Sequence, residues 1–314
     1  MECSWISAVW LSVPLAVAAL LLFFMKSVHH APPKSRPPGP PGWPVIGNML
    51  DLGTMPHQAL YKLRLKYGPL IWLNLGSVGT IVVQSAKAAA DLFKNHDEAV
   101  SDRKVPIALA AHGYSEGSLA IKNYGQQWRA LRKLCAAEFM ASKRINDAAH
   151  VRRKAIDDMI KLIEDEAMAS KARGGRGEVD MPRVFFLMSF NLVGNLMLSK
   201  DLLSSNSEEG HEFFDAMNKV EEWAGKPNIA DFLPFLKRVD PQGIQRGMTR
   251  DMGRALRIAA GFVQERTRVQ GLGIEKVKDF LDALLEYKGD GKKGPEKFSD
   301  RNIEILILGL KDYK

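Results

Sequence analysis

The chain has 314 residues, of which 46% are hydrophobic and 25% are charged. This composition is typical of globular proteins and excludes a collagen or a disordered tail. Lysine and arginine together number 44 against 36 acidic residues, a net charge of +8, which favours anionic partners such as phospholipid headgroups, nucleic acid or an acidic protein face. Two cysteines, Cys3 and Cys135, are too few for a disulfide framework and argue against a cysteine-built zinc site.

The sequence predicts a membrane anchor at residues 1–30. No charged residue occurs from Ile6 to Met25, a run of 20 residues, and such a helix spans about 30 Å, the thickness of the hydrocarbon layer. Glu2 precedes the run and Lys26 follows it, so the positive-inside rule places the body in the cytosol. A cleaved signal peptide is the competing interpretation, but it would have a basic start and a shorter apolar core.

Residues 31–48 predict a proline-rich hinge. Seven of the fourteen residues from Ala31 to Pro44 are proline, which makes the backbone stiff, extended and poor in hydrogen-bond donors. We interpret the segment as a spacer between anchor and body. A ligand for a proline-binding domain is the alternative.

The body, residues 49–314, predicts a small sheet followed by a mainly helical region. Strands at Leu70–Leu75 and Thr80–Gln84 are expected to pair as a hairpin, and residues 97–122 lack clear periodicity and are expected to form a long loop region. Helices are expected over Met55–Tyr67, from Ser85 to Phe93, from Trp128 to Phe139, after Ser142, from Asp180 to Leu198, from Asp240 onward, over Lys278–Tyr287 and after Ser299. The fold class is therefore mainly α, an α-rich α+β fold with a small sheet.

Apolar periodicity predicts which helical faces are buried. Met252, Leu256, Ala259 and Val263 form one stripe, and the helix from Asp180 to Leu198 is apolar on most sides, as a buried helix would be.

A cluster of apolar residues at Ile229–Leu236, flanked by Lys226 and Lys237, suits a second and shallower membrane contact. Packing of this cluster inside the body is the alternative.

The sequence contains no convincing match to the common catalytic and binding motifs. A Gly-x-Gly-x-x-Gly pattern at Gly289–Gly294 follows a predicted helix and runs into Pro295, whereas a dinucleotide loop follows a strand and opens a helix. The seven histidines show no metal-ligand spacing, and the basic residues lack the aromatic interleaving that would indicate nucleic-acid binding. The residues alone identify no catalytic residue and no metal site.

Four segments, taken in chain order, resemble segments of a known protein family. They are the Pro/Gly hinge at residues 37–47, the entry to the small sheet at residues 66–73, a Trp-x-x-x-Arg helix at residues 124–135, and residues 226–234 with 240–243. Together they resemble the cytochromes P-450, the haem-thiolate monooxygenases, of the plant microsomal type. The fourth segment is similar to a subgroup acting on terpenoids and other small lipophilic compounds.

The resemblance implies a haem cofactor, an NADPH-dependent reductase as partner, and a small lipophilic substrate. It also implies a single-pass protein of the endoplasmic reticulum membrane whose body faces the cytosol. In the family, the Trp-x-x-x-Arg pair, here Trp128 and Arg132, holds a haem propionate. Residues four apart share one helix face, and arginine can clamp a carboxylate through two hydrogen bonds. An ordinary basic amphipathic helix is the alternative, since Arg129 and Lys133 also occur in it.

Residues 102–121 correspond in the resemblance to the loop that roofs the substrate pocket. Val105, Ile107, Leu109 and Leu119 are the candidates for lining that pocket. The residues before Tyr124 are less apolar than is usual in the family.

Residues 298–308 resemble the start of the family's long central helix, and the sequence diverges from the family at Gly309. The family's oxygen-activation turn, Glu-x-x-Arg pair and haem Cys loop do not occur in the 314 residues, so residues 49–314 are expected to be an incomplete catalytic domain that is inactive alone. The apolar segment Ile303–Leu308 is then expected to lack its packing partners. A non-catalytic, membrane-tethered interaction protein that competes for the reductase is the alternative.

Overall fold

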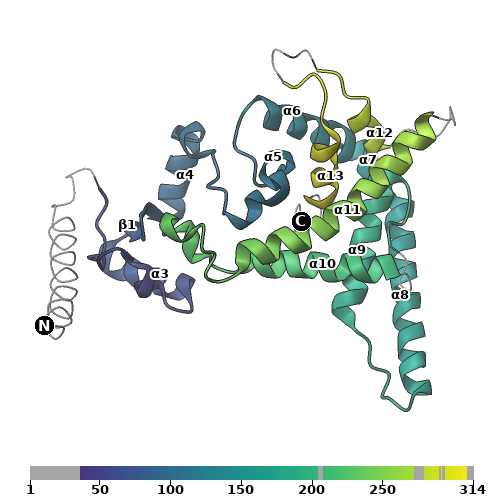
Figure 1. Ribbon diagram of the computed structural model, residues 1–314, viewed down its shortest axis with the longest axis horizontal. Coiled ribbons are helices and arrows are strands. Elements are labelled where there is room, and N and C mark those ends of the chain that lie inside the picture. The colour runs from purple at the N-terminus through teal and green to yellow at the C-terminus, as the bar shows by residue number, and fades with distance from the viewer. Residues whose placement is uncertain (1–35, 204–207, 272–278, 290, 292–293, 310–314) are drawn as a thin grey trace, which may run out of the picture. The chain divides into compact units, whose positions relative to one another are not determined.

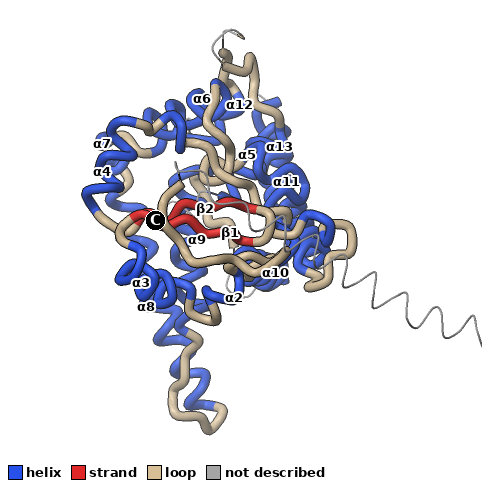
Figure 2. Tube along the Cα trace, turned by 90° about the vertical axis from the view of Figure 1, so that its left-hand side faces the viewer, coloured by secondary structure: helices blue, strands red, loops and turns tan. Residues whose placement is uncertain are grey.

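The computed structural model describes residues 36–203, 208–271, 279–289, 291 and 294–309 (Figure 1). The described residues fall into two compact units. The first unit contains residues 36–100 and 229–241, and the second contains the described residues of 101–228 and 242–309. The predicted anchor lies outside the described residues, as do the first five residues of the predicted hinge. The mainly helical fold with one small sheet is confirmed (Figure 2).

The first unit holds the sheet together with short helices. Its elements are α2 (Met49–Leu52), α3 (Pro56–Tyr67), β1 (Leu70–Leu75), β2 (Val78–Val83), α4 (Ala86–Asn95) and the 3-10 turns η1 (Glu98–Val100), η4 (Ile229–Asp231) and η5 (Pro234–Leu236). The strands pair antiparallel, and Leu75 lies opposite Val78. The second strand therefore begins two residues before its predicted start, because Gly76 adopts a left-handed φ of 58° and closes a two-residue turn.

The residues from Arg36 through the end of the predicted hinge belong to this unit and lie along the hairpin. The backbone N–H of Trp72 donates to the carbonyl of Pro38 at 3.0 Å, and a Cβ at Gly39 would lie 1.9 Å from the Trp72 carbonyl oxygen. Asn48 is fully buried and its Oδ1 accepts the N–H of Asn74 at 2.9 Å. This part of the segment is thus packed structure and not only a spacer.

The segment 229–241 also contacts the hairpin turn. The backbone N–H of Ser77 donates to the carbonyl of Phe232 at 2.9 Å, and Leu233 is 7% exposed. Phe235 is 68% exposed and Ile229 is 38% exposed. The apolar cluster predicted for this segment is therefore divided, with some side chains packed in the unit and others directed to its surface.

The second unit is helical. Its elements are η2 (Ala108–Gly113), α5 (Tyr114–Gly117), α6 (Gln126–Leu134), the π-helical turn η3 (Cys135–Phe139), α7 (Ser142–Asp147), α8 (Ala149–Ala172), α9 (Met181–Leu198), α10 (Glu208–Gly225), α11 (Ile244–Gly271), α12 (Phe280–Leu285) and α13 (Asp300–Gly309). Residues 97–122 were expected to form a loop, but short helical turns occupy much of them. The helix expected after Ser142 is broken at Ala148, and α10 was not predicted.

Side-chain caps fix several helix starts where the sequence places them. The hydroxyl of Ser85 accepts the N–H of Ala88 at 3.1 Å, and Oδ1 of Asp180 accepts the N–H of Arg183 at 3.2 Å. The hydroxyl of Ser299 likewise accepts a backbone N–H in the first turn of α13. In contrast, Asp240 adopts a φ of 47°, so a turn intervenes and α11 begins only at Ile244.

The core of the second unit forms around α11. Its predicted stripe is buried: Met252, Leu256, Ala259 and Val263 are each at most 2% exposed. Aromatic rings join α9 to α10, where the ring centres of Phe190 and Phe213 lie 4.5 Å apart.

Helix α13 packs against α5, α11 and α12. The side chains of Ile303, Ile305, Leu306, Ile307 and Leu308 are each at most 1% exposed. The expectation that this segment lacks packing partners is wrong, because neighbouring helices of the same unit cover it.

Helix α9 is, among the described residues, the one helix long and apolar enough to cross a membrane. Val184, Phe190 and Leu198 on this helix are at most 1% exposed. Helix α9 is thus a core helix of the second unit, as its composition predicts.

A buried ionic network joins α9, α11 and α12. Arg266 donates from Nη1 to Oδ1 of Asp279 at 2.7 Å and to Oδ1 of Asp282 at 2.9 Å, and from Nη2 to the carbonyl of Leu198 at 2.8 Å. Gln270 donates a further hydrogen bond to Asp282. Each side chain of the Arg–Asp–Asp triad is at most 9% exposed. The guanidinium offsets one of the two carboxylate charges, and hydrogen bonds from Ser199 and Gln270 help to stabilise the carboxylates.

Candidate functional site

Helix α6 presents two different faces. Leu131 and Cys135, four residues apart, are buried in the core of the second unit, at 3% and 1% exposure. Arg129, Arg132 and Lys133 are exposed on the other side. This amphipathic pattern fixes the helix against the core and directs its cations outward.

Trp128 connects α6 to the segment before it. The indole Nε1 donates to the carbonyl of Leu119 at 2.9 Å, and the ring centres of Trp128 and Tyr124 lie 5.6 Å apart. The guanidinium carbon of Arg132 lies 5.5 Å from the centre of the Trp128 ring, within cation–π range. The structure thus brings together the two residues that the sequence predicts to act as a pair.

Arg132 makes no ion pair with any carboxylate of the described residues. Arg129, in comparison, lies over the ring of Tyr124 at 5.6 Å. An exposed guanidinium beside an indole, with its N–H donors available, suits a carboxylate ligand because the two planar groups match in a bidentate geometry. At α6 the guanidinium of Arg132 is therefore the donor that fits a haem propionate, whereas the single indole N–H of Trp128 is already donated to Leu119.

The segment before α6 lies close to α13. Gln127 donates from Nε2 to Oδ1 of Asn302 at 3.3 Å, and a Cβ at Gly117 would lie 2.8 Å from the Cβ of Ile305. Ser118 is 1% exposed, and its Oγ has no hydrogen-bond partner in the described part of the chain. A buried hydroxyl without a partner is costly to the fold.

The predicted pocket residues occupy different environments. Val105 and Ile107 are half-buried, Leu109 packs at the edge of the core, and Leu119 is 2% exposed within it. Their role as a pocket lining stays a prediction. Gly117 and Ser118 were not predicted as site residues, and the close approach of Gly117 to α13 is visible only in three dimensions.

Cys135 is the cysteine that the structure describes, and its surroundings oppose ligation. Burial raises the pKa of its thiol to about 12, although the charge of nearby Arg132 acts in the other direction. Metal ligation requires the thiolate, and this thiol is protonated at neutral pH. No cluster of His, Cys, Asp and Glu in the described ranges has the geometry to hold a metal ion.

Comparison of the sequence with known proteins identifies a family to which it is similar. The sequence matches the cytochrome P450 family over residues 37–310. It is 52% identical to iridoid oxidase of Catharanthus roseus over 303 residues, which cover 95% of this chain and 59% of that protein. Identity is 46% over 310 residues with cytochrome P450 76A2 of Solanum melongena, covering 99% and 61% of the two chains. It is 36% over 277 residues with geraniol 8-hydroxylase of Catharanthus roseus, covering 88% and 54%. The chain thus spans about three fifths of the length of the first two relatives.

Proposed function

The chain belongs to the cytochrome P450 family, and from this premise we propose that its residues form the N-terminal part of a monooxygenase that hydroxylates small lipophilic, terpenoid-class substrates. The family implies a haem cofactor. The names of two relatives refer to an iridoid and to geraniol, and both are small and largely apolar. The apolar side chains predicted for the roof segment, Val105, Ile107, Leu109 and Leu119, are of the kind that bind such a substrate.

The pairing of Trp128 and Arg132 is the observation that carries the proposal. Arg132 would hold a propionate at the edge of the haem, and the Trp128 ring would keep the guanidinium on that face of α6. The hydrogen bond from Trp128 to Leu119 ties the roof segment to the same helix. Haem held by a cysteine thiolate would supply the activation of dioxygen.

The thiolate that would hold the haem iron would come from residues other than the 314 of this sequence. Cys135 is buried with a raised pKa, and Cys3 belongs to the predicted anchor. We therefore expect these 314 residues, acting alone, not to form a competent monooxygenase.

The test joins Gly309 to the corresponding C-terminal part of iridoid oxidase from Catharanthus roseus. The joined protein should show, after reduction and addition of carbon monoxide, the absorbance band of thiolate-ligated ferrous haem. The 314-residue chain supplied with haem should not show it. A band from the 314-residue chain would disprove the proposal about the thiolate, and a joined protein without haem would disprove the assignment of the site.

A matched pair of variants tests the role of Arg132 in the joined protein. Arg132→Gln should weaken haem retention by about tenfold or more, because a charge-assisted hydrogen bond is worth about 1.5–3 kcal/mol. Arg153→Gln on α8 removes another exposed arginine and should retain haem. Equal retention by the two variants would remove Arg132 from the site.

We propose further that the protein is anchored in the endoplasmic reticulum membrane with its body in the cytosol and receives electrons from an NADPH-dependent reductase. The uncharged run from Ile6 to Met25 supports the anchor. Alkaline carbonate should leave the protein in the membrane pellet. Protease added to sealed microsomes should digest the body, and full protection would show the opposite orientation.

A second candidate function for the same helix is protein binding without catalysis. Arg129, Arg132 and Lys133 form an exposed basic face on α6, which suits an acidic protein surface. The chain would then be a membrane-tethered protein that competes for the reductase. Inhibition of another P450 by the 314-residue chain, relieved by excess reductase, would favour this function.

A further inference from the structure

We propose that a groove on the first unit, between residues 40–44, α2 and α3, binds one anionic lipid of the membrane. The groove consists of two adjoining hollows with volumes of about 430 Å³ and 490 Å³, each within the range of small-molecule sites. Asp51, Leu63 and Lys66 line both hollows, so the two are continuous. The groove is distinct from the predicted haem site, whose residues Trp128 and Arg132 do not line it.

One face of α3 runs along the groove. Met55, just before the helix, is followed in the lining by Ala59, Lys62, Leu63 and Lys66, and intervals of three or four residues place side chains on one helix face. At 1.5 Å per residue this face is about 16 Å long, which is about half the thickness of the hydrocarbon layer of a membrane. The length therefore suits an acyl chain of one leaflet.

The apolar part of the lining is incompletely covered by the protein. Leu52, Ala59 and Leu63 are half-buried, whereas Leu50 is 67% exposed and Met55 is 48% exposed. In α2 and α3 themselves no residue is buried. An acyl chain in the groove would remove this apolar surface from water, which is favourable.

Two lysines supply the charge that selects an anionic headgroup. Lys62 and Lys66 are exposed and stand four residues apart on α3, where like charges repel each other. Neither makes an ion pair within the described residues, and Nζ of Lys66 lies 5.2 Å from the centre of the Tyr67 ring. In the described lining, Asp51 is the one carboxylate, and it accepts a hydrogen bond from the buried Asn48 at 2.8 Å. The lining thus has one positive charge in excess, which one anionic headgroup would neutralise.

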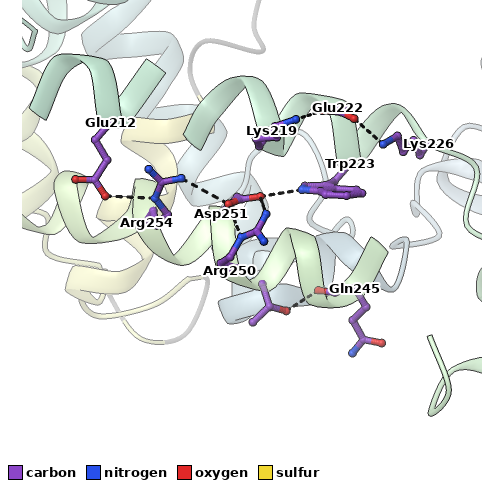
Figure 3. Close-up of polar contacts among 10 residues, drawn as sticks. Glu212, Lys219, Glu222, Trp223, Lys226, Gln245, Arg250, Asp251 and Arg254 are labelled. Carbon is purple, nitrogen blue, oxygen red and sulfur yellow. Dashed lines mark hydrogen bonds and ion pairs between the residues drawn. The ribbon is translucent and has the colours of Figure 1, made fainter. Parts of the chain in front are cut away.

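Several other cations of the chain differ from these lysines, because carboxylates pair with them. Figure 3 shows Lys219 and Lys226 of α10 both in contact with Glu222. Arg250 and Arg254 of α11 are directed to Asp251 in the same way (Figure 3). Lys62 and Lys66, in contrast, can recruit an external anion without breaking an ion pair.

The position of the groove in the chain favours a membrane lipid as the ligand. Pro40 in the groove wall comes ten residues after the end of the predicted anchor at residue 30, and ten residues span at most about 35 Å. Trp43 lines the same groove and is 60% exposed, and tryptophan is enriched at the membrane–water interface. This step rests on the proposed anchor, whereas the apolar lining and the two lysines do not.

The first experiment counts bound lipids and does not depend on haem or on the anchor. The full chain in a neutral detergent receives equal amounts of phosphatidylglycerol and phosphatidylcholine with the same acyl chains, and native mass spectrometry measures what it retains. The chain should retain one phosphatidylglycerol with a preference of about tenfold or more, the size of one charge-assisted hydrogen bond. Lys62→Gln combined with Lys66→Gln should abolish this preference.

The matched control combines Lys87→Gln with Lys94→Gln. Both lysines are exposed on α4 of the same unit, and neither lines the groove. This variant should keep the preference for phosphatidylglycerol. Equal losses in the two double variants, or a preference that survives in the Lys62 and Lys66 variant, would overturn the proposal.

A second experiment locates the lipid. The full chain is placed in phosphatidylcholine nanodiscs in which a fraction of either phosphatidylglycerol or phosphatidylcholine carries brominated acyl chains. The fluorescence of Trp43, measured as the difference between the chain and its Trp43→Phe variant, should be quenched more by the brominated phosphatidylglycerol. Equal quenching by the two lipids would show contact with the bilayer without the proposed selectivity and would overturn the proposal. A chain that stays out of nanodiscs but retains phosphatidylglycerol in detergent through Lys62 and Lys66 would disprove the anchor and support the groove.

Discussion

Replacement of Arg266 by methionine tests whether the buried network holds the second unit together. The change removes a guanidinium that contacts Asp279, Asp282 and the carbonyl of Leu198. Both carboxylates are at most 8% exposed and would remain buried without their cation. Loss of one partner from a buried ion pair costs about 3–5 kcal/mol, so Arg266→Met should lower the free energy of unfolding by about that amount.

Urea denaturation of the full chain in detergent, followed by tryptophan fluorescence, measures this loss. Arg268→Met is the control, because Arg268 lies two positions away on α11 and is exposed, and exposed substitutions usually stay within about 0.5 kcal/mol. The combined change of Arg266 to Met and of Asp279 and Asp282 to Asn should recover part of the loss, since no unpaired charge stays buried. Equal effects of the two single variants would refute the reasoning.

The effect of Arg266→Met should also depend on pH. Burial by itself raises the pKa of Asp282, but hydrogen bonds from the Asp279 backbone and from Arg266 outweigh it and hold the pKa below its ordinary value. A carboxyl whose pKa is lower in the folded state stabilises the fold above its unfolded pKa of about 3.9 and loses that contribution as the pH falls through the folded value. The difference between wild type and variant should therefore be full at neutral pH and narrow below about pH 4.

Three further predictions follow from individual side chains. Cys135 should resist alkylation by iodoacetamide at neutral pH in the folded chain and react after denaturation, because burial raises the pKa of its thiol to about 12. Mass spectrometry of the Cys135 peptide measures the labelling, and rapid labelling in the native state would contradict this prediction. Gly117→Ala should destabilise the chain by about 1–3 kcal/mol through overpacking against α13. Gly261→Ala is the control: its new Cβ would meet nothing within 4 Å, and it should stabilise α11 by about 0.5–1 kcal/mol. Thermal unfolding compares the two variants, and equal changes in their midpoint temperatures would count against the contact between Gly117 and α13. In a chain lacking its first 30 residues, Phe235→Ser should reduce flotation with liposomes more than Phe93→Ser, since both rings are exposed but only Phe235 lies in the predicted membrane contact; equal flotation would remove that contact.

The helices and strands were predictable wherever local chemistry determines them. The caps at Ser85, Asp180 and Ser299 fix helix starts through short-range hydrogen bonds, and the stripe on α11 follows from its period alone. Residues 97–122 could not be read in this way, because their short turns are held by distant groups. His112, for example, contacts Thr249, 137 positions later in the chain.

The pairing of Trp128 with Arg132 was predictable because both residues lie on one helix and their spacing determines their proximity. The resemblance to the P450 family adds the prediction that this pair binds a haem propionate. Ser118 and Gly117 were not predictable, because their importance depends on how closely α13 approaches them. The same limit applied to Ile303–Leu308, whose apolar pattern predicts burial but not which helices bury it.

The positive charge of this chain takes two physical forms, and ionic strength separates them. Arg266 is buried beside two carboxylates, so dissolved salt screens that interaction little and the loss in Arg266→Met should persist in concentrated salt. Arg132 is exposed and makes no ion pair within the described residues, so its attraction to an external anion is open to screening. Salt should therefore weaken the contribution of Arg132 to haem retention in the joined protein while it leaves the contribution of the buried triad unchanged. If both effects declined together, the buried network would be more accessible to water than the structure shows, and the division between stabilising and ligand-binding arginines would fail.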